Sequence, residues 1–267
     1  MTNITIDITS DPVCPWCYMG KIRLERAISL YQKVYPGGRH DTFRVVWHAF
    51  YLEPDASAGT PGVPWSNRHA QKFGGRGDGE DETRGRHLRE QLAAKGRQHG
   101  IEFSFGGKIG STRDAHRLIA LAGRREKKEG TGEGTGLQDR VVMQLFRDFF
   151  EDEADITSRS MLADVAEQAG MGRRADVLEW LEGGEGGSEV DEEARWAREE
   201  GQMKGVPRFV VQGKHVIDGA QDEQAFMEAF VKVKEEGEGE SEKRAPSSSV
   251  GSDPGAAVSC APGGSCS

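Results

Sequence analysis

The feature that most constrains the fold of this chain is the motif Cys14-Pro15-Trp16-Cys17. Apolar and polar side chains alternate over residues 4–8 before it, which predicts a β-strand, and apolar residues recur at helical spacing after it as far as Val34. The first thiol is therefore expected at a helix N-terminus, where free N–H groups and the helix dipole stabilise a thiolate. Pro15 suits the first helical turn, because its missing N–H is not needed there. The second thiol follows one turn later, within reach of a mixed disulfide formed by the first.

Two other interpretations of this motif are a zinc knuckle and a structural disulfide. A closed zinc site usually has four ligands, whereas the only other cysteines, Cys260 and Cys266, lie near the end of a segment without the pattern of a folded element. A disulfide that closes so short a loop would add little stability. Redox chemistry is therefore the favoured interpretation, with Cys14 and Cys17 as catalytic residues. The seven histidines show no metal-ligand spacing with carboxylates, so the sequence predicts no metal site.

Composition narrows the class of protein. The 267 residues are enough to bury a sizeable core. A net charge of −9 argues against nucleic acid and against an anionic membrane surface as partners. No apolar stretch approaches the roughly 20 residues that a membrane span requires, and residues 1–10 lack the pattern of a secretory signal. We therefore expect a cytoplasmic protein whose disulfide is transient and catalytic. The oligomeric state stays open.

The order of expected elements predicts an α/β fold interrupted by helices. A strand, a helix and a second strand over residues 43–50 indicate a parallel pair with a right-handed crossover. Residues 209–217 have the pattern of a β-hairpin, and a final helix follows it. Between these parts, amphipathic helices are expected near 86–99, 112–122, 137–150, 159–169, 174–182 and 189–200.

This order divides the chain into three parts. Residues 1–52 and 202–234 are expected to form one discontinuous α/β domain, and residues 53–201 a helical insertion between its halves. Residues 235–267 are acidic and then rich in Ser, Pro and Gly. Because they contain too few apolar side chains to form a core, we expect them to be a disordered tail.

Several segments of the chain resemble the DsbA-like thioredoxin proteins of the FrnE type, which are related to 2-hydroxychromene-2-carboxylate isomerases and kappa-class glutathione transferases. The matching segments are spread over residues 4–234 in the family's order. They are Ser10-Asp11-Pro12-Val13-Cys14-Pro15-Trp16-Cys17-Tyr18-Met19-Gly20-Lys21, Trp47-His48-Ala49-Phe50-Tyr51-Leu52-Glu53-Pro54, Thr112-Arg113-Asp114-Ala115-His116-Arg117, Asp155-Ile156, Gly205-Val206-Pro207-Arg208-Phe209 and Gly219-Ala220-Gln221. The resemblance implies a thioredoxin fold with a large helical insertion.

The resemblance also implies roles for individual residues. Cys14 would be the attacking thiol and Cys17 the resolving thiol. Pro207 would be a cis proline that lies against both cysteines, leaving the backbone of Val206 free to pair with an extended substrate. Arg208 stands where the family usually has a small hydroxyl residue. Its cation would either stabilise the thiolate further or point to solvent.

Other residues near the motifs carry predictions of their own. Trp16 is either a contact surface for substrate or a shield for the thiolate. His116, on an expected helix, is assigned to packing or helix capping ahead of catalysis. The segment Gly219-Ala220-Gln221 is either a plain helix start or a site for a carboxylate such as that of glutathione. Cys260 and Cys266 are either inert thiols or a regulatory dithiol that a flexible tail brings to the active site.

Three functions agree with these observations. The first is a thiol–disulfide oxidoreductase that acts on a disulfide-containing protein or a small-molecule thiol, with no bound cofactor and with glutathione as the candidate thiol partner. The second is a glutathione-dependent isomerase or transferase, but there a serine usually replaces the first cysteine, and this chain has Cys14. The third is a binding or chaperone-like module with a redox-silent dithiol. The sequence favours the first.

Overall fold

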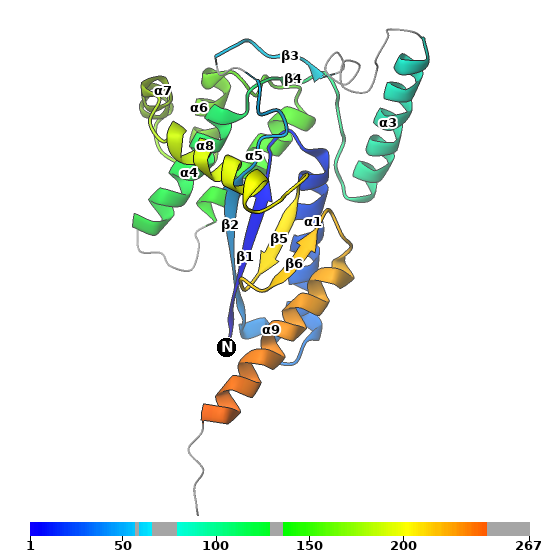
Figure 1. Cartoon of the computed structure of the whole chain (residues 1–267), viewed down its shortest axis with the longest axis vertical. Helices are drawn as coiled ribbons and strands as arrows, with labels where there is room; N and C mark the ends of the chain where they lie inside the picture. The colour runs from blue at the N-terminus through cyan, green and yellow to red at the C-terminus, as the bar shows by residue number, and fades with distance from the viewer. Residues whose placement is uncertain (57–58, 66–78, 129–135, 245–267) are drawn as a thin grey trace, which may run out of the picture.

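The central feature of the computed structural model is a four-stranded sheet in the order β2-β1-β5-β6 (Figure 1). The structure describes residues 1–56, 59–65, 79–128 and 136–244. Strand β1 pairs in parallel with β2 and antiparallel with β5, and β5 pairs antiparallel with β6. The strands are β1 (Asn3–Ser10), β2 (Thr42–Ala49), β5 (Arg208–Val211) and β6 (His215–Asp218). The predicted parallel pair and the predicted hairpin are both confirmed.

Helices cover this sheet and build the insertion between β2 and β5. They are α1 (Pro15–Val34), α3 (Gly79–Gln98), α4 (Arg113–Lys128), α5 (Leu137–Phe150), α6 (Arg159–Gln168), α7 (Arg174–Gly183), α8 (Gly187–Glu199) and α9 (Glu223–Arg244). Helices α1 and α9 contact each other, whereas α4, α5 and α8 contact β2. Helix α3 lies apart from α4–α8, on the side where α1 lies (Figure 1). A 3-10 turn at Gly38–His40 and a two-stranded pair of β3 (Val63–Pro64) with β4 (Lys108–Ile109) complete the described elements.

Buried side chains of the core fix the position of α1, the helix that carries the motif. The alternation of β1 buries every second side chain as far as Ser10. On α1, Tyr18 stacks on Phe146 of α5 with 5.1 Å between ring centroids. At the other end of α1, Tyr31 meets Phe230 of α9 edge to face at 5.7 Å. The helix that carries the motif is therefore anchored by aromatic contacts to both the insertion and the last helix.

A histidine joins the sheet to the insertion. The ring nitrogens of His48 on β2 lie 2.9 Å from Asp7 of β1 and 2.7 Å from Glu193 of α8. Burial alone would lower the pKa of His48, but the two carboxylates outweigh it and raise the pKa to about 9. The imidazolium form therefore binds α8 to the sheet, and its contribution to stability is lost as the pH rises through about 9.

The expected tail boundary near residue 235 differs from the structure. Helix α9 continues to Arg244, so residues 235–244 are helical and not part of a disordered tail. The ammonium of Lys214, at the turn of the hairpin, pairs with Glu236 at 3.1 Å and holds the helix beyond the last apolar residues. Glu and Lys are also good helix formers, and no proline interrupts this segment. Residues 245–267 lie outside the described residues. Among the described helices, none combines the length and apolar character needed to cross a membrane.

Candidate active site

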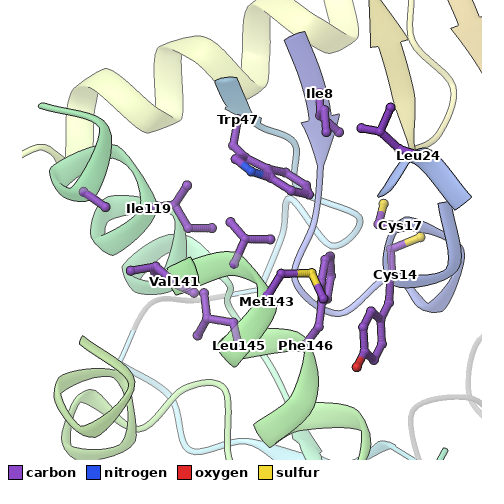
Figure 2. Close-up of a cluster of buried hydrophobic side chains, with 14 of the residues drawn as sticks. Ile8, Cys14, Cys17, Leu24, Trp47, Ile119, Val141, Met143, Leu145 and Phe146 are labelled. Atoms are coloured by element: carbon purple, nitrogen blue, oxygen red, sulfur yellow. The ribbon is translucent and has the colours of Figure 1, made fainter. Parts of the chain in front are cut away.

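The two thiols of the motif lie at the start of α1. Cys14 is the N-cap of the helix, and Cys17 follows in its first turn. The backbone N–H groups of Cys17 and Tyr18 donate to the Cys14 carbonyl at 3.0 and 3.3 Å, which closes that turn. Both cysteines are free thiols and both are buried, with 4% and 1% of their surface exposed. Figure 2 shows the two side chains at one edge of the buried cluster, with Ile8 and Leu24 nearby.

The segment before β5 completes the site. The Val206–Pro207 peptide bond is cis. The Cys14 thiol donates to the Val206 carbonyl oxygen, with 3.6 Å between sulfur and oxygen. Close packing here depends on Gly20 of α1, because a Cβ at that position would lie 3.0 Å from the Phe209 ring and 3.3 Å from Pro207. The structure thus brings Cys14 and the Val206–Pro207 segment together.

The ionisation of Cys17 is controlled by its burial and by its polar neighbours. Burial raises the pKa of Cys17 well above the usual range of a thiol, and a hydrogen bond and charge interaction with Cys14 raise it further. The nearby Ser10 hydroxyl and the backbone of Asp11 oppose this rise in the pKa. Cys17 is therefore held as a neutral thiol.

Ser10 is a site residue to which the sequence reasoning assigned no role. Its side chain is 4% exposed, and within the described part of the chain its hydroxyl has no hydrogen-bond partner of good geometry. It lies close enough to Cys17 to lower the pKa of that thiol. The signal was present in the sequence, because the period of β1 places this one polar residue on the face that buries Ile4, Ile6 and Ile8.

Trp16 lies on the surface beside the buried thiols. Its side chain is 37% exposed, and the Lys95 ammonium of α3 lies 5.2 Å from its ring centroid, the geometry of a cation–π contact. An exposed aromatic ring next to a reactive sulfur agrees with a contact surface for substrate. The sequence analysis did not predict a role for Lys95, because this contact joins two residues about 80 positions apart in the chain.

Two residues near the cis proline have other partners. The Arg208 guanidinium binds Asp218 across the hairpin, at 2.6 Å from its Nε, and also donates to the Gly201 carbonyl. It therefore does not point freely to solvent, and among the described residues no contact joins it to a cysteine. The N–H groups of Gly219 and Gln221 donate to the carbonyls of Pro207 and Gly219 at 2.8 and 2.9 Å. Helix α9 begins only at Glu223, so Gly219-Ala220-Gln221 precedes the helix and is not its start. The N–H groups of Gly219 and Gln221 are occupied, which does not support a carboxylate site there.

His116 is a buried structural residue. Its Nε2 lies 3.1 Å from the Phe50 carbonyl oxygen, to which it donates, and 3.9 Å from a carboxylate oxygen of Asp11. Its ring is 3% exposed, and burial lowers its pKa to about 4. His116 thus ties α4 to the backbone just after β2, and no contact joins it to either sulfur among the described residues.

The lowered pKa of His116 predicts a loss of stability in acid. In the unfolded chain, His116 binds a proton as the pH falls below its ordinary pKa of about 6.5. In the folded protein it binds that proton only near pH 4, so acid favours the unfolded chain. Between pH 7 and pH 5, this group alone is expected to lower the free energy of unfolding by about 2 kcal/mol. Urea unfolding at pH 7 and pH 5 measures this change in the free energy of unfolding. The change should be smaller for His116→Gln than for the wild type, whereas the exposed control His87→Gln should show the wild-type change. Equal differences for all three proteins would contradict this account.

The remaining site predictions lie partly outside the structure. Cys260 and Cys266 fall outside the described residues. Within the described ranges, no three His, Cys, Asp or Glu side chains are grouped so that they could hold a metal ion. The chemistry that the described site supports is exchange at the two thiols, with Ser10 and the Val206 carbonyl as their polar neighbours.

Comparison with known proteins agrees with this geometry. A family model described as the DSBA-like thioredoxin domain matches residues 5–231. A probable DsbA oxidoreductase from Streptomyces coelicolor has a similar structure, with a TM-score of 0.70 and 26% identity over 87% of this chain and 91% of that one. A 2-hydroxychromene-2-carboxylate isomerase has a TM-score of 0.56 and 16% identity over 90% of this chain and 100% of that one, which shows a shared fold. No curated protein matches the sequence significantly. With the family model covering most of its length and the thiols lying beside the cis proline, the chain belongs to the DSBA-like thioredoxin family.

Proposed function

We propose that this protein is a thiol–disulfide oxidoreductase in which Cys14 attacks and Cys17 resolves. The observation that carries the proposal is the unequal placement of the two thiols. Cys14 caps α1 and faces the Val206 carbonyl at the cis proline, whereas Cys17 is enclosed and its pKa is raised by burial. One thiol is thus placed to meet substrate, and the other is held in reserve as a neutral thiol.

In the first step, the Cys14 thiolate attacks one sulfur of a substrate disulfide. A bond forms between Cys14 and that sulfur, the substrate disulfide breaks, and the other substrate sulfur leaves as a thiolate. Cys14 attacks from the N-terminal end of α1, where the helix dipole favours negative charge. The exposed ring of Trp16 and the backbone beside Pro207 are the surfaces against which the substrate would lie.

In the second step, Cys17 loses its proton and its thiolate attacks the sulfur of Cys14. The intramolecular disulfide forms, the mixed disulfide breaks, and the second substrate thiolate leaves, so two electrons have passed from the protein to the substrate. Formation of the mixed disulfide removes the Cys14 thiol, whose hydrogen bond and charge raise the pKa of Cys17. The lowering influence of Ser10 remains. Cys17 therefore becomes easier to ionise at the step that requires its thiolate, and an external thiol then returns the pair to the dithiol.

The direct test is reduction of insulin disulfides with dithiothreitol as the external thiol, with the wild type beside Cys14→Ser. We expect the wild type to accelerate the reaction and the variant to match the uncatalysed rate, because serine cannot form the mixed disulfide. An inactive wild type, or a variant as active as the wild type, would contradict the proposal. Glutathione-dependent isomerisation of a small molecule would then be the next activity to measure.

A further inference from the structure

Three cationic side chains, with an aromatic ring and a histidine between them, line the surface where α1 meets the end of α3. We call this the α1–α3 seam, and it consists of Trp16, Arg23 and Arg26 on α1 with Lys95 and His99 at the end of α3. Residues 16 and 23 are seven positions apart, so they share one face of α1. Lys95 lies over the Trp16 ring, and His99, four positions later, lies between the two guanidinium groups. The seam is thus continuous from the reactive end of the helix through two further turns.

The hydrogen bonds around His99 are unbalanced. Its Nε2 lies 3.2 Å from the Arg23 Nε, and its Nδ1 lies 2.9 Å from an Arg26 terminal nitrogen. Burial and the two guanidinium groups lower the pKa of His99, which keeps the ring neutral. A neutral imidazole has one N–H and one lone pair, so it can accept from only one arginine, and its own N–H then faces the other. The seam therefore holds more donors than acceptors.

The positive charge of the seam is only partly balanced. Glu223 lies 3.8 Å from Arg26, and it is the one carboxylate that pairs with these side chains among the residues that the structure describes. Arg23 donates instead to the carbonyl oxygens of Ala220 and Gln221. Lys95 is exposed and has no carboxylate partner within the described part of the chain. The seam is therefore a locally positive surface on a chain whose net charge is −9, and such a surface attracts a negatively charged group.

We propose that the α1–α3 seam binds an acidic side chain of a disulfide-bearing polypeptide substrate. The inference rests on the proposed oxidoreductase function and specifies its substrate class. Nine residues of α1 separate positions 14 and 23, which is about 13 Å along the helix axis. An extended peptide covers that distance in about four residues. The favoured substrate therefore carries Asp or Glu three or four residues from the cysteine that Cys14 attacks.

The test uses matched peptide disulfides that differ only in one charge. Each peptide carries a single cysteine in a mixed disulfide with a coloured thiol. One further position, the third or the fourth from that cysteine, is either Glu or Gln, before the cysteine in one series and after it in another. We expect kcat/KM to be about two- to five-fold higher for the Glu peptide in one series at low salt, the range for exposed ion pairs. The ratio should approach one at high salt, because screening weakens exposed charge pairs.

Variants of the two exposed cations, Arg26 and Lys95, distinguish binding at the seam from an effect of the overall charge of the protein. Arg26→Gln and Lys95→Gln should each lower the Glu/Gln ratio. Lys33→Gln is the matched control, because Lys33 is an exposed cation on the same face of α1, seven positions beyond Arg26. It should keep the wild-type ratio. The double charge reversal Arg26→Glu with Lys95→Glu should make a Lys peptide the better substrate.

The possible results distinguish this inference from the proposed function. Equal rates for the Glu and Gln peptides in both series, with an active wild type, would overturn the seam as a substrate site and leave the oxidoreductase intact. A ratio that falls as much in Lys33→Gln as in Arg26→Gln would also overturn it, because the effect would then come from overall charge. A wild type that reduces neither the peptides nor insulin would contradict the proposed function and the inference together.

Discussion

Replacement of Cys17 by serine is expected to trap substrate on Cys14. The variant can still form the mixed disulfide, but serine cannot attack the sulfur of Cys14, so the step that releases product is lost. Without dithiothreitol, we expect no release of product from the mixed disulfide, and one covalently bound peptide per protein molecule when a mixed-disulfide peptide is added. Intact-mass spectrometry under non-reducing conditions measures the adduct, and dithiothreitol should remove it.

The control for this experiment is a background without the other two cysteines of the chain. In Cys260→Ser with Cys266→Ser, only the active-site thiols remain, so any adduct in the Cys17→Ser variant must lie on Cys14. Addition of Cys14→Ser to this background should prevent the adduct. Retained release of product by Cys17→Ser without dithiothreitol would refute the assigned roles. If the trapped peptide is released only when Cys260 and Cys266 are present, these two cysteines can act as a resolving dithiol.

The parts of this site that the sequence predicted depend on local patterns. The alternation of β1 and the helical spacing after Cys14 place the thiols at a strand-to-helix junction, and the structure confirms that placement. The parallel pairing with β2 follows from the length of the connection, because a crossover of this length suits a parallel neighbour. The expectation that Pro207 lies beside the cysteines came from the family resemblance and not from any local pattern, since Cys14 and Val206 are 192 residues apart.

The parts that the sequence did not predict depend on contacts between distant elements. Nothing in the pattern of α3 indicates that Lys95 lies over Trp16 or that His99 lies between two arginines, because docking of one helix on another is set by the whole core. The pairing of Arg208 with Asp218 depends in the same way on the register of the hairpin. Ser10 is the exception, since a polar residue at a core position of β1 could have been noticed from the sequence.

Replacement of Arg117 by methionine is expected to cause the largest loss of stability outside the active site. Its fully buried guanidinium pairs with Asp114 at 2.6 Å and donates to the carbonyl oxygens of Leu181 and Glu185 at 2.9 and 2.7 Å. Removal of one partner from a buried ion pair costs about 3–5 kcal/mol, because the remaining polar groups stay buried without their donor. For a chain of this size, the melting temperature should fall by roughly 6–20 °C.

Arg124→Met is the matched control for this prediction. Arg124 lies on the same helix, two turns beyond Arg117, and both guanidinium groups lie over the Trp180 ring, at 5.8 and 4.8 Å. It is 42% exposed and pairs with the exposed Glu189, so its loss should cost less than about 1 kcal/mol. Equal losses in the two variants would show that the buried network is not the cause. The hydrogen-bond partners of Arg117 lie on α4 and at the end of α7, and neither active-site thiol is among them. The folded fraction of Arg117→Met should therefore reduce insulin at the wild-type rate. A lowered rate per folded molecule would instead connect this part of the insertion to the chemistry of Cys14.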